Sequence, residues 1–427
     1  MSDIFAELQW RGLIHQTTDD NNLPNWLADA PRTLYIGFDP TADSLHVGSL
    51  LQLMTLRRFQ RAGHEALALV GGATGMIGDP SGKSKERSLL TADVLEKNVA
   101  GMRQQMTQFL DFDGSNPAKL VNNHDWMGSF SYLDFLRDVG KNFPVNVMMA
   151  KDSVKSRLGR EDTGISYTEF SYMLLQAYDF VYLNQNFGCE LQVGGSDQWG
   201  NITAGIDLGR RMHQVQLFGL TSPLLTKTDG TKMGKTESGA IWLDADKTSP
   251  YAFYQYWVNV DDADAGKCLR FLTELSKEEI EELDASRAAD PGRRESQNRL
   301  AQELTRLVHG DAGLQAAERA KSIFFGGGSI EGLDDRSLDQ IFADVPSCEI
   351  ERSRLSGEGL SVIDALAESK LCQSKGEARR TIKEGGAYVN NERVGEMEAV
   401  LTEKHLASES MIVLRRGKKK YALVKLI

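Results

Sequence analysis

Residues 33–70 read TLYIGFDPTADSLHVGSLLQLMTLRRFQRAGHEALALV, and this stretch indicates the fold class. Thr33–Phe38 is a short apolar run that predicts a buried strand, and Ala66–Val70 predicts a second one. Between them, residues 48–61 repeat leucine and methionine at helical spacing until Gly63 ends the pattern. A strand, a helix and a second strand in this order predict a parallel sheet.

A third predicted strand, Glu190–Val193, is followed by two glycines and another helical pattern. Ligands of such sheets bind beyond the carboxyl ends of the strands. We therefore expect the residues that follow Phe38, Val70 and Val193 to contribute to one site.

The pattern changes at Ser249–Pro250, a pair that is typical of a helix start. Helical periodicity rich in Glu, Arg and Ala continues to about Phe325, which predicts a helical domain. The end of the chain has a mixed pattern, with helices and strands predicted over 362–369, 375–384, 387–391 and 411–424. The predicted fold is therefore α/β: a Rossmann-like parallel-sheet domain, then a helical domain and a small α+β C-terminal domain.

The composition is typical of a soluble protein of two or three domains, with 427 residues, 41% hydrophobic and 26% charged. Net charge is −11, yet residues 370–427 hold 13 Lys and Arg against 7 Asp and Glu. This basic end favours an appended nucleic-acid-binding module, although a solvated basic face has the same composition. Four separated cysteines, and the lack of a signal peptide or a long apolar run, favour a cytoplasmic protein without a membrane span.

The segment Gly37–Gly48 joins the first strand to the helix and places His46 at the helix start. A helix N-terminus offers unpaired N–H groups and a partial positive charge, so it suits a phosphate. Gly48 allows close backbone approach, and an imidazole can donate to a phosphate oxygen. For an isolated His-x-Gly, a capping or core histidine is the commoner outcome.

Two further segments have the composition of phosphate-handling loops. The glycine-rich segment after Val70 has neither P-loop nor dinucleotide spacing, but it carries Asp79, Lys83 and Arg87. Thr226–Thr236 is a glycine-interrupted loop whose two lysines can stabilise a departing pyrophosphate. An exposed lysine-rich turn is the alternative interpretation of that loop.

Together these segments closely resemble the class I aminoacyl-tRNA synthetases, specifically the tyrosyl enzymes of bacteria and mitochondria. Pro40–Ser49 matches the first motif of the family, which usually ends His-Ile-Gly-His, and Lys232–Thr236 matches the second, usually Lys-Met-Ser-Lys-Ser. Segments matching the tyrosyl branch are Gly71–Pro80, Ser166–Asp179 and Gln192–Asn201. Leu360–Val394 resembles an RNA-binding module shared with a small-subunit ribosomal protein.

The resemblance implies a two-step reaction in which the tyrosine carboxylate attacks the α-phosphorus of ATP and tyrosine then passes to the terminal adenosine of tRNA. ATP would enter with Mg²⁺, and no tightly bound cofactor is expected. By resemblance, the catalytic residues are His46, Lys83, Arg87, Lys232 and Lys235. By the same resemblance, ATP is bound by Asp39, Thr41, His46, Gly48, Ser49, Asp197, Lys232, Lys235 and Thr236.

The amino-acid pocket is predicted partly from spacing. Tyr172, Gln176 and Asp179 are four and three residues apart, so they share one helix face. An ordinary polar face is the alternative, but a face meant for water seldom needs tyrosine. By resemblance, Tyr172, Gln176 and Asp79 hold the substrate ammonium, while Tyr35 and Asp179 bind its phenol hydroxyl. The further pocket positions are Asn123 and Gln198.

The resemblance also implies domains and partners. It predicts a catalytic domain over 1–228 with a dimer-interface insert at about 119–160, a lysine loop and helical anticodon-binding domain over 229–330, a linker over 331–354 and an RNA-binding domain over 355–427. The partners would be the tRNA for tyrosine and a second copy of the chain. Candidate interface anchors, with core packing as the alternative, are Phe130, Tyr132, Phe135, Leu136 and Phe143.

One departure from the family keeps two other interpretations open. Ser49 replaces the second histidine of the first motif. Ser49 supports a catalytically silent RNA-binding or splicing protein, while retention of His46, Lys232 and Lys235 counts against it. A tryptophanyl enzyme is disfavoured by the Tyr35/Asp179 pair.

Overall fold

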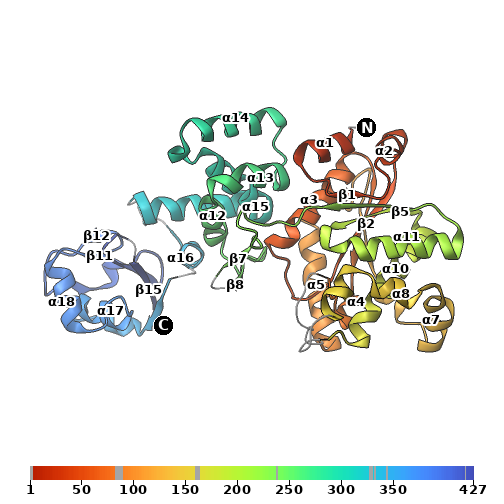
Figure 1. The fold of residues 1–427 in the computed structure, drawn as a ribbon. Helices are drawn as coiled ribbons and strands as arrows, with labels where there is room; N and C mark the ends of the chain where they lie inside the picture. Colours follow the sequence, from red (N-terminus) through yellow and green to blue (C-terminus); the bar gives the residue numbers. More distant parts are fainter. Residues whose placement is uncertain are drawn as a thin grey trace. The chain divides into compact units, whose positions relative to one another are not determined.

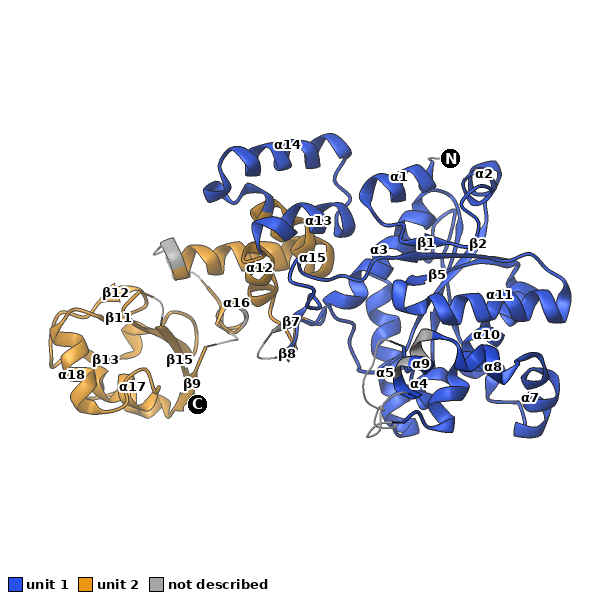
Figure 2. Cartoon of the chain, viewed as in Figure 1, with its two compact units in different colours: residues 1–244, 261–296 blue, residues 245–260, 297–427 orange. Residues whose placement is uncertain are grey.

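The computed structural model describes residues 3–81, 90–158, 164–236, 239–326, 330, 333–342, 345–418 and 420–427. The chain forms two compact units, residues 1–244 with 261–296, and residues 245–260 with 297–427 (Figure 2). The region 229–330, which the sequence predicts as lysine loop and helical domain, is thus shared between the two units. Among the described residues, no helix has the length and apolar character needed to cross a membrane.

The first unit is built on a six-stranded sheet in the order β1-β6-β5-β2-β3-β4 (Figure 1). Its strands are β1 (Gln16–Thr17), β2 (Thr33–Phe38), β3 (Glu65–Val70), β4 (Lys119–Asn122), β5 (Cys189–Gly195) and β6 (Phe218–Ser222). β6, β5, β2, β3 and β4 are parallel, and β1 is an antiparallel edge strand. The α/β class with a parallel sheet is therefore confirmed.

Helices cover both faces of this sheet, which is why its strands are apolar almost throughout. α3 (Val47–Arg61) and α5 (Ala92–Met106) pack on β3, while α10 (Tyr167–Phe187) and α11 (Trp199–His213) pack on β5. β2, α3 and β3 lie within one residue of their predicted bounds. Because side chains alternate along a strand, Tyr35, Leu67 and Leu69 share one face and pack in a cluster with Phe180 of α10.

The other elements of the first unit are shorter. They are α1 (Ile4–Arg11), α2 (Leu23–Asp29), α4 (Thr74–Ile77), α6 (His124–Met127), α7 (Tyr132–Asp138), α8 (Val145–Met149), α9 (Asp152–Leu158), β7 (Lys235–Thr236), β8 (Gly239–Ala240), α13 (Asp262–Leu272) and α14 (Lys277–Ala289). The C-terminal end of α13 is hydrogen-bonded to α3. Arg58 of α3 donates to the carbonyls of Phe271 (2.9 Å) and Thr273 (2.8 Å), which the helix end leaves unpaired.

The second unit joins helices to a C-terminal sheet. Its elements are α12 (Pro250–Val258), most of α15 (Glu295–Gly326), α16 (Asp335–Ile341), β9 (Ser347–Ile350), β10 (Leu360–Ser361), α17 (Val362–Glu368), α18 (Lys375–Lys383), β11 (Ala387–Val389), β12 (Glu392–Arg393), β13 (Val400–Leu401), β14 (Met411–Arg416) and β15 (Lys420–Leu426). As predicted, Ser249 caps α12, accepting from the Ala252 N–H. Strand β9 lies inside the stretch predicted as linker and pairs in parallel with β15, so the sheet includes residues before Leu355.

Candidate active site

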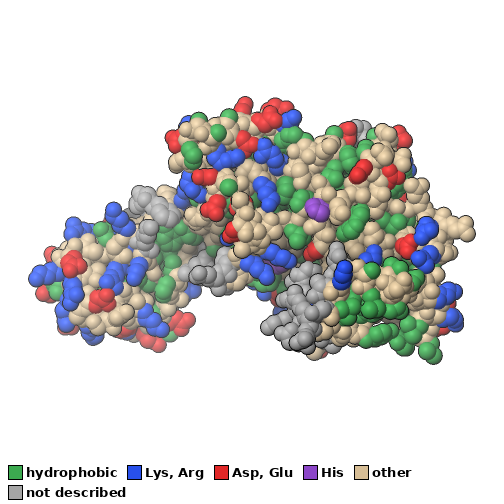
Figure 3. Space-filling view, viewed as in Figure 1, with side chains coloured by type: hydrophobic (Ala, Val, Ile, Leu, Met, Phe, Trp, Pro, Cys, Tyr) green, Lys and Arg blue, Asp and Glu red, His purple; other side chains and the backbone are tan. Residues whose placement is uncertain are grey.

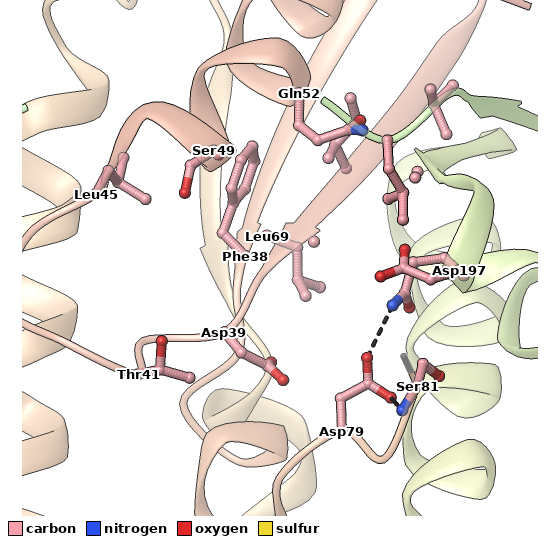
Figure 4. A pocket seen from close by; sticks show the side chains of 18 of the residues that line it. Phe38, Asp39, Thr41, Leu45, Ser49, Gln52, Leu69, Asp79, Ser81 and Asp197 are labelled. Atoms are coloured by element: carbon pink, nitrogen blue, oxygen red, sulfur yellow. Dashed lines mark hydrogen bonds between the residues drawn. The ribbon is translucent and has the colours of Figure 1, made fainter. Parts of the chain in front are cut away.

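One cavity of about 340 Å³ opens at the carboxyl ends of β2 and β5 (Figure 4). The segments that follow β2, β3 and β5 all contribute to its lining, as expected for a sheet of this kind. The predicted site residues that line it are Tyr35, Asp39, Thr41, His46, Gly48, Ser49, Asp79, Tyr172, Gln176, Asp179, Asp197, Gln198, Lys232 and Lys235. Lys83 and Arg87 lie outside the described residues, as does the side chain of Thr236.

Asp179 lies at the buried end of the cavity and accepts two hydrogen bonds. Trp126 Nε1 donates to one carboxylate oxygen at 2.8 Å, and Asn123 Nδ2 donates to the other at 3.0 Å. Burial raises the pKa of Asp179 to about 8, although both hydrogen bonds act in the opposite direction. Asn123, which does not line the cavity, thus supports a residue that does. Trp126 was missed because nothing in its local sequence pattern points toward Asp179.

Tyr35 lies beside Asp179 on the same side of the sheet. Its ring packs edge-on against Phe180, with ring centroids 5.4 Å apart. The side chain is buried, and among the described residues its hydroxyl has no hydrogen-bond partner. Burial is the main cause that raises the pKa of Tyr35 well above its ordinary value, so this hydroxyl stays protonated. It is a neutral polar group facing a cavity that can hold a hydrogen-bonding ligand.

Asp39 and Tyr172 are joined directly. The Tyr172 hydroxyl donates to Asp39 Oδ2 at 2.7 Å, and Thr74 Oγ1 donates to Asp39 Oδ1 at 2.7 Å. Asp39 directly follows β2, whereas Tyr172 comes from α10. The sequence predicts both residues in the site but not this bond between them.

A second polar network surrounds Asp79. Gln198 Nε2 donates to Asp79 Oδ2 at 2.8 Å, and the Ser81 N–H donates to Oδ1 at 2.9 Å (Figure 4). Asn201 of α11 donates to the side-chain oxygens of Gln176 (3.0 Å) and Gln198 (3.2 Å). Asn201 therefore orients two predicted pocket residues, and no local sequence pattern indicates this role.

The first motif forms a tight turn at the start of α3. His46 precedes the helix in extended conformation, and Ser49 Oγ lies 3.5 Å from His46 Nδ1, at the long end of the hydrogen-bond range. A Cβ atom at Gly48 would lie 2.7 Å from His46 Cε1. A larger residue at this position would therefore force the imidazole to shift, so glycine preserves the observed orientation of His46.

The second motif lies directly against the first. The Ile241 N–H donates to the Gly234 carbonyl at 2.8 Å, and the Val47 N–H donates to the Ile241 carbonyl at 2.9 Å. Gly234 has a φ of 77°, and a Cβ there would lie 2.7 Å from the Cβ of Val47. Glycine in place of the usual serine thus allows the two motifs to approach closely. Lys232 and Lys235 both reach the cavity lining.

Known proteins resemble the chain along its whole length. Residues 28–326 match the family described as class I tRNA synthetases (W and Y), and residues 337–424 match a tyrosine–tRNA ligase SYY-like C-terminal domain. The tyrosine–tRNA ligase of Rhodopirellula baltica is 62% identical, covering 100% of this chain and 97% of the relative. That of Bacillus caldotenax is 52% identical, covering 99% of each.

A solved structure agrees with these sequence relatives. The C-terminally truncated mitochondrial tyrosyl-tRNA synthetase of Aspergillus nidulans superposes with a TM-score of 0.68 at 32% identity, covering 76% of this chain and 95% of that one. Both domain models, the full-length relatives and the site described above agree with one another. The chain therefore belongs to the tyrosine–tRNA ligases of the class I aminoacyl-tRNA synthetase family.

Proposed function

We propose that this chain activates L-tyrosine with ATP and transfers it to the 3′-terminal adenosine of its tRNA. The observation that carries the proposal is the placement of the two motifs and the Tyr172/Gln176/Asp179 helix face around one cavity. Such a cavity can hold the tyrosine carboxylate in line with the ATP α-phosphorus. Positioning and charge stabilisation then supply the catalysis without a covalent enzyme intermediate.

The tyrosine side chain is proposed to point toward Tyr35 and Asp179. Its phenol hydroxyl would donate to Asp179 and accept from the Tyr35 hydroxyl, which has no partner among the described residues. The ammonium group would lie at Asp79, Tyr172 and Gln176, with Gln198 holding Asp79 in place. Phenylalanine would leave the buried polar groups unpaired, a penalty for which this enzyme family is the usual example.

ATP is proposed to bind along the N-terminus of α3, with Mg²⁺ entering as part of the substrate. His46 would contact a phosphate oxygen, and Gly48, Ser49 and Thr41 would lie beside the nucleotide. Asp39 would hold the adenylate and Asp197 the ribose. The pyrophosphate would be stabilised by Lys83, Arg87, Lys232 and Lys235, with Thr236 next to this last lysine.

The deciding experiment is tyrosine-dependent exchange of labelled pyrophosphate into ATP by the full chain. We expect exchange with tyrosine and none with tryptophan. Exchange with tryptophan alone would favour a tryptophanyl enzyme. The absence of exchange with either amino acid, from a chain that still binds the tRNA, would favour the silent RNA-binding protein.

A homodimer is proposed from the surface of the inserted segment. Apolar side chains gather there over α7 and α8 (Figure 3), with Tyr132, Leu133 and Val145 exposed by 63%, 74% and 58%. Exposed apolar patches of this kind mark interaction sites. Of the predicted anchors, Phe130 and Phe135 instead pack edge-on against each other, 5.6 Å between ring centroids. Light scattering coupled to gel filtration tests the proposal, because a monomer at micromolar concentration contradicts it.

We propose a cytoplasmic location, where ATP and tRNA are available. The C-terminal domain is proposed to bind the tRNA, since residues 370–427 carry a balance of +6 while the chain as a whole carries −11. Phosphate contacts from Lys and Arg give affinity without sequence specificity.

A further inference from the structure

The loop that carries Lys232 and Lys235 is attached to one helix, α13. Its hairpin is closed by a bridge between Thr226 and Lys232 and by the Met233 N–H donating to the Leu225 carbonyl at 3.0 Å. These bonds shape the hairpin but do not fix it to the rest of the unit. Besides the backbone bonds that link Gly234 through Ile241 to Val47, attachment comes from side chains of a helix that begins about thirty residues later in the chain.

Three α13 side chains contact the loop. Lys267 Nζ donates to the Thr226 carbonyl at 2.6 Å, and Thr228 Oγ1 donates to Asp264 Oδ1 at 2.7 Å. Cys268 Sγ lies 3.5 Å from Met233 Sδ. Lys267 and Cys268 lie three and four residues after Asp264, so the three side chains lie on one face of the helix. A single helix face therefore contacts both arms of the hairpin.

On the α13 side these contacts are partly shielded from water, so they constrain the loop more than fully exposed contacts would. Asp264, Cys268 and Met233 are buried, with exposed fractions of 2%, 0% and 3%. Burial raises the pKa of the Cys268 thiol to about 12, so this cysteine packs and does not react. The ammonium of Lys267, which is half-buried, also lies 5.7 Å from the centre of the Phe271 ring.

The same helix is fixed to the first motif. Arg58 of α3 holds the C-terminal carbonyls of α13, and α3 begins at His46–Val47. One continuous path of bonded groups thus runs from the first motif through α3 and α13 to the lysine loop. α13 is therefore a second connection between the two motifs, in addition to their direct contact at Gly234.

We propose that Asp264, Lys267 and Cys268 are positioning residues for the lysine loop. They place Lys232 and Lys235 against the pyrophosphate while touching neither substrate. This inference rests on the proposed function, in which the two lysines stabilise the departing pyrophosphate. It assigns to α13, which the sequence predicts as part of a tRNA-binding helical domain, a role in the first step of the reaction.

The first test measures catalysis by Lys267→Met, which removes the donor and keeps the aliphatic stem. We expect kcat for tyrosine-dependent exchange to fall roughly 10- to 100-fold, because small misplacements of charge-stabilising groups have effects of this size. The Kd of tyrosine and the single-turnover transfer from preformed tyrosyl-adenylate to tRNA should not change. Lys267→Arg should restore part of the rate. Lys277→Met, the same change at an exposed position on α14, is the matched control.

A double-mutant cycle distinguishes positioning from general damage. If Lys267 acts through the two loop lysines, then adding Lys267→Met to a Lys232→Ala/Lys235→Ala variant should lower kcat by less than twofold, whereas independent effects would multiply. Multiplying effects overturn the proposal. If Lys267→Met folds poorly, Thr228→Val serves as the second variant. It removes the hydrogen bond to Asp264 from the loop side and should lower kcat in the same way.

A second test does not depend on activity. Limited trypsin digestion of the full chain, followed by mass spectrometry, reports cleavage after Lys232 and Lys235. Thr228→Val should speed cleavage at these two bonds roughly 10-fold, since local opening exposes the loop, and leave sites outside this hairpin unchanged. An unchanged rate overturns the anchoring even if the wild-type chain shows no exchange. If the wild-type chain shows no exchange but the variant is cleaved faster, only the proposed function is contradicted, and the anchoring of the loop stands.

Discussion

Replacing Tyr35 by phenylalanine separates the stability of the fold from recognition of the substrate. The Tyr35 hydroxyl is buried and, among the described residues, has no hydrogen-bond partner. The aromatic ring at position 35 can keep its edge contact with Phe180 whether the residue is tyrosine or phenylalanine. Tyr35→Phe therefore removes one polar atom that the ligand-free protein does not pair.

We expect Tyr35→Phe to leave unchanged or raise the free energy of unfolding, and to lower kcat/KM for tyrosine. A buried unpaired hydroxyl costs about 1–3 kcal/mol, so the free energy of unfolding should be unchanged or rise by about 1 kcal/mol. With tyrosine bound, the same hydroxyl would form a neutral hydrogen bond to the phenol, which contributes about 0.5–1.5 kcal/mol net. At about 1.4 kcal/mol for each tenfold, kcat/KM for tyrosine should fall roughly 2- to 12-fold. The kcat/KM for phenylalanine should not change, because phenylalanine has no hydroxyl to pair with Tyr35.

Urea unfolding gives the first quantity and pyrophosphate exchange with each amino acid gives the second. A loss of more than about 1 kcal/mol of unfolding free energy would show that the hydroxyl is paired in the free protein. An equal fall in kcat/KM for tyrosine and phenylalanine would refute the placement of the phenol at Tyr35. In either case the arrangement proposed for the buried end of the cavity would be wrong.

Three further outcomes are expected. Asp179→Asn sets an amide donor against Trp126 or Asn123 and leaves a buried polar group unpaired, a penalty of about 1–3 kcal/mol, so tyrosine exchange should fall roughly 5- to 150-fold, with a smaller change for phenylalanine. Because the pKa of Asp179 rises from 3.8 to about 8 on folding, the folded chain holds a proton between these pH values that the unfolded chain releases. Unfolding free energy should therefore decrease from pH 4 to 8, and Asp179→Asn should flatten that slope in pH-dependent urea melts. Replacing exposed Arg379 and Arg380 of α18 by alanine should weaken tRNA binding in a filter assay and reduce its salt dependence, while exchange without tRNA stays constant.

Local patterns were sufficient for the elements that carry the site. The apolar run Thr33–Phe38 became β2, and the helix after it begins within one residue of its predicted start. Spacing of four and three brought Tyr172, Gln176 and Asp179 to one face of α10, because that relation depends only on helical geometry. These predictions succeeded where the information lies within a few residues.

Contacts between distant segments were not predictable in the same way. Trp126 donates a hydrogen bond to Asp179, although more than fifty residues separate them in the sequence. Likewise, β9 pairs with β15, which lies at the other end of the C-terminal domain in the sequence. Neither pairing has a local periodicity that specifies its partner. A four-residue strand beside a weak helical pattern looks like a linker until its partner is known. The α13 contacts to the lysine loop belong to the same class, since α13 by itself is an ordinary amphipathic helix.

The charges around the cavity explain why the position of that loop matters. Four aspartate side chains line the cavity, namely Asp39, Asp79, Asp179 and Asp197, and those that are ionised suit an incoming ammonium group but oppose a polyphosphate. Among the described lining residues, the Lys and Arg side chains are Lys232 and Lys235. Burial and the neighbouring carboxylate of Asp79 raise the pKa of Asp197, whereas Lys232 acts to lower it. The loop thus brings positive charge to a site otherwise rich in acids, and a loop held loosely would leave ATP facing those acids without compensation.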